Sequence, residues 1–253
     1  MQQSHPFLPN RPPVPIAHRG GTDSAAENTL AAFQGAIEQG YCYIETDVHC
    51  TSDGVLVAFH DDRLDRLTTS KGRIAELTWS EIADVRLDGG ETIPRFDDVL
   101  GSFPDVKINI DPKSDGAVAP LIRTLRTGNV LDRVCIGSFS DRRLGRIHDE
   151  FGERVCLSAG PREILALRLA AWGLGRRRPR ARCAQVPPSQ LGIPIVDQRF
   201  VDHCHDVGLQ VHVWTINDES EMVRLLELGV DAIMTDTTER LLSVMDAHGG
   251  TAA

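Results

Sequence analysis

The sequence predicts an α/β protein, a closed (β/α)8 barrel with a small insertion after the second strand. Strand-like and helix-like runs alternate eight times along the 253 residues, and each strand-like run is almost continuously apolar. Such strands are typical of a parallel sheet buried on both faces, and about 250 residues is the usual length of this barrel. A doubly wound open sheet is the alternative, but no GxGxxG motif follows a strand.

The elements are expected in a regular order from the N-terminus. The first strand is VPIAHRG (14–20), and the first helix is NTLAAFQGAIEQG (28–40), capped by Asn28 or Thr29. The run IETDVHCTSDGVLVAFHD (44–61) predicts a hairpin, followed by a mixed segment over residues 62–105 with a short helix beginning near Ser80. The other strands are expected at 106–113, 133–139, 154–160, 182–188, 210–218 and 230–236, and their helices at 116–129, 140–152, 161–173, 197–209, 219–229 and 237–249.

The hairpin carries an unusual number of acidic and imidazole side chains. Asp53-Gly54 is a strong two-residue turn signal, and a turn centred on it would place Asp47 opposite His60. Glu45, Asp47 and His60 would then share one face. Two carboxylates two residues apart on a strand could bind a hard cation such as Ca²⁺ or Mg²⁺, with Asp111 on the next barrel strand as a third ligand.

Polar residues cluster at the C-terminal ends of the predicted strands, where barrels of this type keep their active sites. This clustering is the main evidence for an enzyme. The two histidines, His18 and His60, suit general acid and base work on a phosphate ester, and Arg19 and Lys113 could clamp phosphate oxygens. The plainer alternative is that Glu45 and Asp47 are solvated or salt-bridged residues at a strand end. The clustered polar residues are His18, Arg19, Glu45, Asp47, Asp111, Lys113, Ser138, Trp214, Asn217, Thr235 and Asp236.

Composition narrows the classes of function. The 27 basic and 36 acidic residues give a net charge of −9, which argues against general binding of nucleic acid. The N-terminus lacks the apolar core of a signal peptide, and no apolar run is long enough to span a membrane, so a cytoplasmic protein is expected.

The six cysteines form no CxxC pair, so we expect reduced structural thiols, with zinc ligation as the weaker alternative. The arginine-rich run 176–182 is expected to be a solvated loop, with contact to anionic lipid as the alternative.

The motifs AHRGG, ENTLAAF, IETDVHCTSDGVLVAFHD, NIDPK, VWTIND and GVDAIMTD resemble, in this order, the glycerophosphodiester phosphodiesterase family. The resemblance covers residues 14–245 and implies a single TIM-barrel domain over residues 1–253, in which residues 62–95 correspond to the family's small insertion. It implies metal-dependent cleavage of glycerophosphodiesters to sn-glycerol 3-phosphate and an alcohol. It assigns His18 and His60 as the acid/base pair, Glu45, Asp47 and Asp111 as ligands of one divalent cation (Mg²⁺, Ca²⁺ or Mn²⁺), Arg19 and Lys113 as phosphate ligands, Glu27 as a supporting residue and Trp214 as an apolar wall for the glycerol.

Two departures from the family pattern stand in NIDPK. Asp111 takes a place where the family often has Glu, and Pro112 removes a backbone donor, so the strand should end there. Other functions stay open: the same chemistry on lysophospholipids or inositol phosphodiesters, a lyase reaction that stops at a cyclic product, or an inactive ligand-binding barrel. The leaving alcohol, the native metal and the oligomeric state are not predicted.

Overall fold

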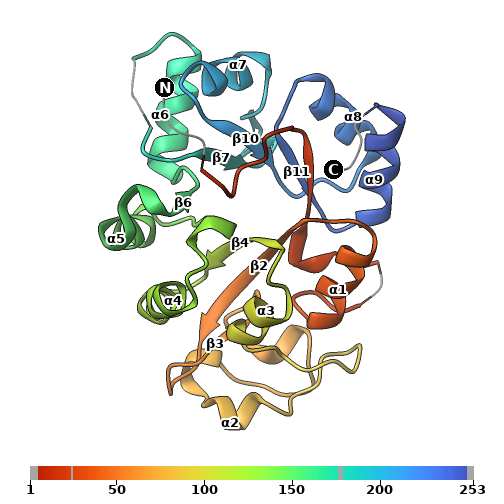
Figure 1. Ribbon diagram of the computed structural model, residues 1–253, viewed down its shortest axis with the longest axis vertical. Coiled ribbons are helices and arrows are strands. Elements are labelled where there is room, and N and C mark those ends of the chain that lie inside the picture. The colour runs from red at the N-terminus through yellow and green to blue at the C-terminus, as the bar shows by residue number, and fades with distance from the viewer. Residues whose placement is uncertain (1–4, 24, 176–178, 250–253) are drawn as a thin grey trace.

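The computed structural model describes residues 5–23, 25–175 and 179–249, and it has the predicted (β/α)8 architecture (Figure 1). Eight parallel strands follow one another around the barrel in chain order. A parallel bridge between Ser158 and Cys183 joins the fifth strand to the sixth and closes the ring. The strands are β1 (Val14–Ala17), β2 (Tyr43–Cys50), β4 (Lys107–Pro112), β5 (Val134–Ile136), β6 (Cys156–Leu157), β7 (Cys183–Val186), β10 (Gln210–Val213) and β11 (Ala232–Thr235).

Helices surround the strands on the outside (Figure 1). Several begin where a side-chain oxygen accepts a hydrogen bond from the first turn, as at Thr29, Ser140 and Asp218. The helices are α1 (Leu30–Glu38), α2 (Trp79–Ile82), α3 (Phe96–Ser102), α4 (Asp115–Gly128), α5 (Asp141–Phe151), α6 (Pro161–Ala171), α7 (Gln198–Asp206), α8 (Glu219–Glu227) and α9 (Thr238–Ala247), with short 3-10 turns at His18–Gly20, Leu64–Arg66, Ile74–Glu76, Leu131–Arg133 and Gly152–Arg154.

Alternate side chains of β2 face the apolar layer beneath the helices and the interior of the barrel. Ile44 and Val48 belong to the apolar core between the sheet and the helices. Tyr43, Glu45 and Asp47 alternate with them and therefore face the barrel interior. All five side chains are buried. The same strand thus carries an aromatic residue at the barrel floor and two carboxylates progressively nearer its mouth.

Residues 5–9 close the N-terminal end of the barrel. The Phe7 ring packs edge-on against Tyr43 at 5.5 Å between centroids, and the Tyr43 hydroxyl donates to the Phe7 carbonyl oxygen at 2.9 Å. Gln210 Nε2 donates to the Pro9 carbonyl oxygen at 3.2 Å. This floor leaves the opposite, C-terminal end as the barrel's mouth.

The hairpin forms, but the predicted register is wrong. Strand β3 (Leu56–Ala58) pairs antiparallel to β2 with Val48 opposite Ala58, and the Phe59 amide donates to the Asp47 carbonyl oxygen at 3.1 Å. Asp47 therefore lies opposite Phe59, one position from the expected partner His60. The cause is the turn. The Thr51 amide bonds the Val55 carbonyl oxygen, so the loop has three residues and ends in Gly54 at φ +88°.

The chain between β3 and α3 forms the predicted insertion, which projects to one side of the barrel (Figure 1). It has its own apolar cluster, which includes Phe59, Leu64, Ile74 and Ile93. Helix α3 and a small hairpin of β8 (Ser189–Gln190) and β9 (Ile193–Pro194) were not predicted. Strand β4 ends at Pro112, as expected.

Three further expectations concern the chain as a whole. Within the described ranges, no helix combines the length and the apolar character needed to cross a bilayer. None of the six cysteines, all of which are described, forms a disulfide. Of the predicted arginine-rich loop, residues 176–178 lie outside the described residues, while Arg182 is buried and pairs with Glu153 at 2.8 Å.

Candidate active site

The turn that follows β1 places His18 and Arg19 at the barrel mouth. Arg19 adopts a left-handed backbone with φ 54°, and Gly20 follows with φ +85°. A Cβ at Gly20 would lie 2.8 Å from the backbone carbon of Ala32, so only glycine lets the turn pack this closely on α1. Left-handed backbone is costly for a residue with a side chain, and such conformations cluster at functional sites.

His18 lies between two carboxylates. Its Nδ1 is 2.6 Å from Asp236 Oδ1, and its Nε2 is 3.8 Å from Glu45 Oε2. Burial alone would lower the pKa of His18, but the negative charge of Glu45 and the hydrogen bond to Asp236 raise it above its ordinary value. Asn217 Nδ2 donates to the other oxygen of Asp236 at 2.9 Å and orients that carboxylate. The contact with Asp236 leaves Nε2 as the nitrogen that faces the interior of the site.

Glu45 and Asp47 lie side by side with different partners. Glu45 Oε2 accepts the Arg19 amide at 3.1 Å, and burial together with the charge of Asp47 raises the pKa of Glu45 to about 7. Asp47 lies 3.1 Å from Arg19 Nε and accepts Asn28 Nδ2 at 3.1 Å. Burial would raise the pKa of Asp47, but Lys113 and Arg19 lower it below its ordinary value.

Lys113 joins Asp47 on β2 to Asp111, which lies opposite Asp47 on β4. Its Nζ lies 2.7 Å from Asp47 Oδ1 and 2.8 Å from Asp111 Oδ2. Burial would lower the pKa of Lys113, but these two carboxylates raise it above its ordinary value. Burial raises the pKa of Asp111. The ammonium group thus holds the two carboxylates together at the mouth.

A second network reaches His60 from the insertion. His60 Nδ1 lies 2.6 Å from Asp61 Oδ1. Arg66 donates to Asp61 at 2.6 Å and to Glu27 at 2.7 Å, and Glu27 also accepts Arg19 at 3.0 Å. Hydrogen bonding by Arg66 lowers the pKa of Asp61 to about 2, so this carboxylate is ionised and can only accept from His60 Nδ1.

The two networks meet around an open hollow of about 480 Å³ at the mouth. His60 and Lys113 both line it, together with His49, Asp61, Asp62, Arg63, Asp65 and Arg66. His49 Nε2 donates to the His60 carbonyl oxygen at 3.0 Å and so fixes the backbone there. His60 lines the hollow although the predicted register was wrong, because the chain leaves β2 directly after the bond between the Phe59 amide and the Asp47 carbonyl oxygen.

Trp214, at the end of β10, takes part in an aromatic contact at the mouth. Its ring packs edge-on against Phe139, which follows β5, with 5.5 Å between centroids. Phe139 is 65% exposed. This contact does not tie Trp214 to the charged cluster, so its predicted role as a glycerol wall stays a prediction.

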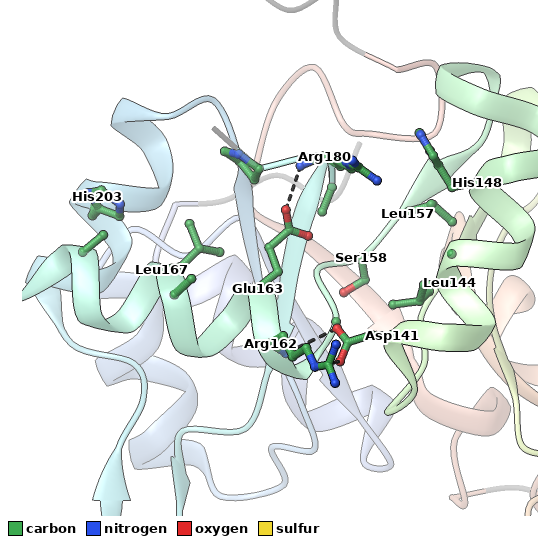
Figure 2. A pocket seen from close by; sticks show the side chains of 16 residues that line it. Asp141, Leu144, His148, Leu157, Ser158, Arg162, Glu163, Leu167, Arg180 and His203 are labelled. Atoms are coloured by element: carbon green, nitrogen blue, oxygen red, sulfur yellow. Dashed lines mark hydrogen bonds and ion pairs between the residues drawn. The ribbon is translucent and has the colours of Figure 1, made fainter. Parts of the chain in front are cut away.

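A separate cavity of about 410 Å³ lies between α5 and α6 (Figure 2). Asp141 and Arg162 stand at one end of it, and Glu163 accepts the Arg180 amide across it at 2.7 Å. None of the nine predicted site residues lines this cavity. We place the candidate active site at the barrel mouth, because the shifted pKa values and the paired charges gather there.

The structure brings together all but one of the nine predicted site residues. Eight belong to the two linked networks: His18, Arg19, Glu27, Glu45, Asp47, His60, Asp111 and Lys113. No role was predicted for the residues that orient them: Asn28, His49, Asp61, Arg66, Asn217 and Asp236. Asn217 and Asp236 were already among the polar strand ends, and Asn28 and Asp61 directly follow predicted site residues, so position was an available signal for these four.

Three carboxylates at the mouth could hold a divalent cation. Glu45, Asp47 and Asp111 offer carboxylate oxygens, the donors that hard cations prefer. The raised pKa of Glu45 shows a buried carboxylate without enough positive charge nearby to keep it ionised. Within the described ranges, one oxygen from each of the three carboxylates cannot be chosen so that all three lie within 4.8 Å of one another. The chemistry of the donors fits such a cation, provided that Lys113 gives up one of its two carboxylates.

Comparison with protein families gives one match over most of the chain. Residues 18–240 match the family described as "Glycerophosphoryl diester phosphodiesterase family". A "Probable glycerophosphodiester phosphodiesterase 2" of Mycobacterium tuberculosis is 38% identical over 250 residues, which cover 96% of this chain and 94% of that protein. A "Lysophospholipase D" of Homo sapiens is 28% identical and covers 89% of this chain and 84% of that protein.

Comparison with solved structures adds a bound product. A phosphodiesterase of Oleispira antarctica, solved in complex with the product sn-glycerol-3-phosphate, superimposes with a TM-score of 0.76. It is 26% identical and covers 93% of this chain and 97% of that one.

Proposed function

Because the chain belongs to the glycerophosphoryl diester phosphodiesterase family, as its motifs predicted, we propose that it hydrolyses glycerophosphodiesters to sn-glycerol 3-phosphate and an alcohol. The solved relative from Oleispira antarctica holds sn-glycerol-3-phosphate as its product, which supports this choice of substrate class.

One observation carries the proposal: each of the two histidines has a carboxylate on its Nδ1 atom. His18 pairs with Asp236 and His60 with Asp61, both at 2.6 Å. A carboxylate that accepts from Nδ1 fixes the ring and leaves Nε2 to exchange a proton with substrate. Two such histidines beside one charged cluster supply a general base and a general acid for a single displacement.

The first step is a transfer within the substrate. One histidine removes the proton of the glycerol 2-hydroxyl while its oxygen forms a bond to phosphorus. The other histidine donates a proton to the leaving oxygen as the old P–O bond breaks, which releases the alcohol and a cyclic phosphate. Water then opens the ring with the two histidine roles reversed, and the product is sn-glycerol 3-phosphate.

Positive charge at the mouth is needed because the chain as a whole is acidic. Arg19 and Lys113 would bind phosphate oxygens, and Glu27 holds Arg19 in place at 3.0 Å. We propose Glu45, Asp47 and Asp111 as ligands of one divalent cation, Mg²⁺, Ca²⁺ or Mn²⁺. When bound, that cation would supply Lewis-acid stabilisation of charge on the phosphoryl group.

The experiment is release of sn-glycerol 3-phosphate from glycerophosphocholine and glycerophosphoethanolamine by purified protein. Release that EDTA abolishes and that one of the three cations restores is expected. Release unaffected by exhaustive EDTA treatment would overturn the metal assignment. No release with any cation, from folded protein, would overturn the substrate class.

Lysophospholipid substrates are the second candidate, and the exposed Phe139 ring on Trp214 favours them. An apolar surface beside the mouth could receive an acyl chain. The Homo sapiens relative named lysophospholipase D supports the same possibility. The ratio of turnover on lysophosphatidylcholine to turnover on glycerophosphocholine decides between the two. If Phe139→Ser lowers turnover on the lysolipid alone, the acyl chain uses this surface; if both fall equally, the candidate is wrong.

A further inference from the structure

The barrel floor holds a cluster of three thiols that sequence spacing did not reveal. Cys135, Cys156 and Cys183 come from the neighbouring strands β5, β6 and β7, and their Sγ atoms all lie within 4.8 Å of one another. Cys135 Sγ and Cys183 Sγ are 3.8 Å apart. We propose that this thiol cluster is a trigonal binding site for a soft monovalent metal ion, Cu(I).

The spacing of the sulfurs fits three-coordinate ligation. Thiolate–metal bonds of about 2.3 Å in a trigonal plane place the sulfurs about 4.0 Å apart. The 3.8 Å separation of Cys135 and Cys183 and the 4.8 Å limit on the whole cluster bracket that value. Small side-chain rotations would therefore bring the three sulfurs onto one ion.

The number and kind of donors select the ion. Structural zinc takes four ligands, and within the described ranges no fourth His, Asp or Glu atom joins the three thiols. Thiolate is a soft ligand that selects Cu(I), while carboxylate and water suit Mg²⁺ and Ca²⁺. The thiol cluster and the carboxylates of the mouth thus suit different metals at opposite ends of the barrel.

The surroundings compensate the charge that ligation creates. Three thiolates around Cu(I) carry a net charge of −2. Lys107 Nζ donates to the hydroxyl of Tyr43, which belongs to the same buried cluster as the three cysteines, and the buried Arg182 directly precedes Cys183. A buried anionic centre needs opposite charge nearby, and these two basic residues would supply it.

The thiol cluster is sealed from solvent. All three cysteines are 0% exposed, and Phe7 and Leu8 of the floor segment pack against them. Exchange of an ion would require opening of residues 5–9. Dry surroundings exclude oxidants and favour a slowly exchanging ion. The ion would therefore enter more readily during refolding than in the native state.

The test uses the Cys42→Ser/Cys50→Ser protein, which lacks the two cysteines that are not fully buried. It is loaded anaerobically with Cu(I) in the presence of a competing chelator, both in the native state and during refolding. One Cu(I) per chain is expected, retained when Cys204→Ala is added and lost when Cys156→Ala is added. Cys204 is the matched control because it is buried on α7, outside the thiol cluster.

Absence of bound Cu(I) under both loading conditions, or full binding with Cys156→Ala, would overturn the proposal. If the Cys156→Ala protein does not fold, X-ray absorption at the copper edge of the loaded parent decides. Three sulfur neighbours at about 2.3 Å support the site, and two or fewer contradict it.

Discussion

His18 Nδ1 and Asp236 Oδ1 lie 2.6 Å apart, although 218 positions separate them in the chain. The contact exists because β1 and β11 are neighbours in the closed barrel, with Ala17 opposite Thr235. It joins His18 to the residue that follows the last strand. The negative charge of Glu45 and this hydrogen bond to Asp236 both raise the pKa of His18.

Asp236→Asn should lower the pKa of His18, because a neutral amide no longer stabilises the imidazolium. The limb of the pH profile of kcat/KM that reports His18 should move to lower pH, and kcat/KM should fall roughly 10- to 100-fold. The pH dependence of sn-glycerol 3-phosphate release measures both. Asp231→Asn is the control, since Asp231 pairs with His205 at 2.8 Å outside the site. An unmoved profile in Asp236→Asn would show that the contact is not functional.

Glu45→Gln should change how stability depends on pH in EDTA-treated protein. Burial raises the folded pKa of Glu45 from 4.5 to about 7, so the folded state binds this proton more tightly than the unfolded state. Stability from this group is present below about pH 4.5 and is lost as pH rises to about 7. The difference is up to about 3 kcal/mol. Gln cannot titrate, so the variant's denaturation curve should vary less with pH.

Added Mg²⁺ completes the experiment on Glu45. It should restore wild-type stability at neutral pH, because a cation keeps the carboxylate ionised, and it should have little effect on Glu45→Gln. Equal stabilisation of the two proteins would contradict Glu45 as a ligand.

Lys113→Met should destabilise the metal-free protein by about 3 kcal/mol, because Asp47 and Asp111 lose the cation between them. Denaturant titration in EDTA measures this loss, and a divalent cation should recover more stability in the variant than in the wild type. Lys107→Met is a matched control at the other end of β4, because Lys107 bonds the Tyr43 hydroxyl instead of a carboxylate. Equal losses in the two variants would show that the paired carboxylates are not the cause.

Gly20→Ala should unfold the turn that carries His18 and Arg19. The new Cβ would meet the Ala32 backbone at 2.8 Å, and the φ of +85° disfavours any side chain. A loss of about 2 kcal/mol or more is expected in denaturant. Gly145→Ala on α5 meets open space and should instead gain up to about 1 kcal/mol. Similar stabilities for the two variants would mean that the turn can relax.

Fold and site differ in how far the sequence predicted them. The barrel was predictable because each strand is a local apolar run, and strand ends meet at one mouth in any such barrel. The hairpin register was not, because Thr51 and Gly54 build a three-residue loop from the same Asp-Gly signal that a two-residue turn uses. The pairing of His18 with Asp236 depends on barrel closure, which no local pattern reveals.

The thiol cluster shows the same limit more sharply. Its members lie at positions 135, 156 and 183, and only the register of three neighbouring strands brings their sulfurs together. Sequence spacing indicated isolated structural thiols, because a metal site on a barrel floor need not follow the short CxxC spacing of a metal-binding loop.

The central claim is that His18 and His60 exchange the protons of phosphodiester cleavage. The most direct test follows glycerophosphocholine by ³¹P NMR with wild type, His18→Ala, His60→Ala and the control His203→Ala, which lies on α7. Wild type and control should form sn-glycerol 3-phosphate, and each site variant should be slower by at least about 100-fold while remaining folded. Turnover within a few-fold of wild type in either site variant would contradict the claim.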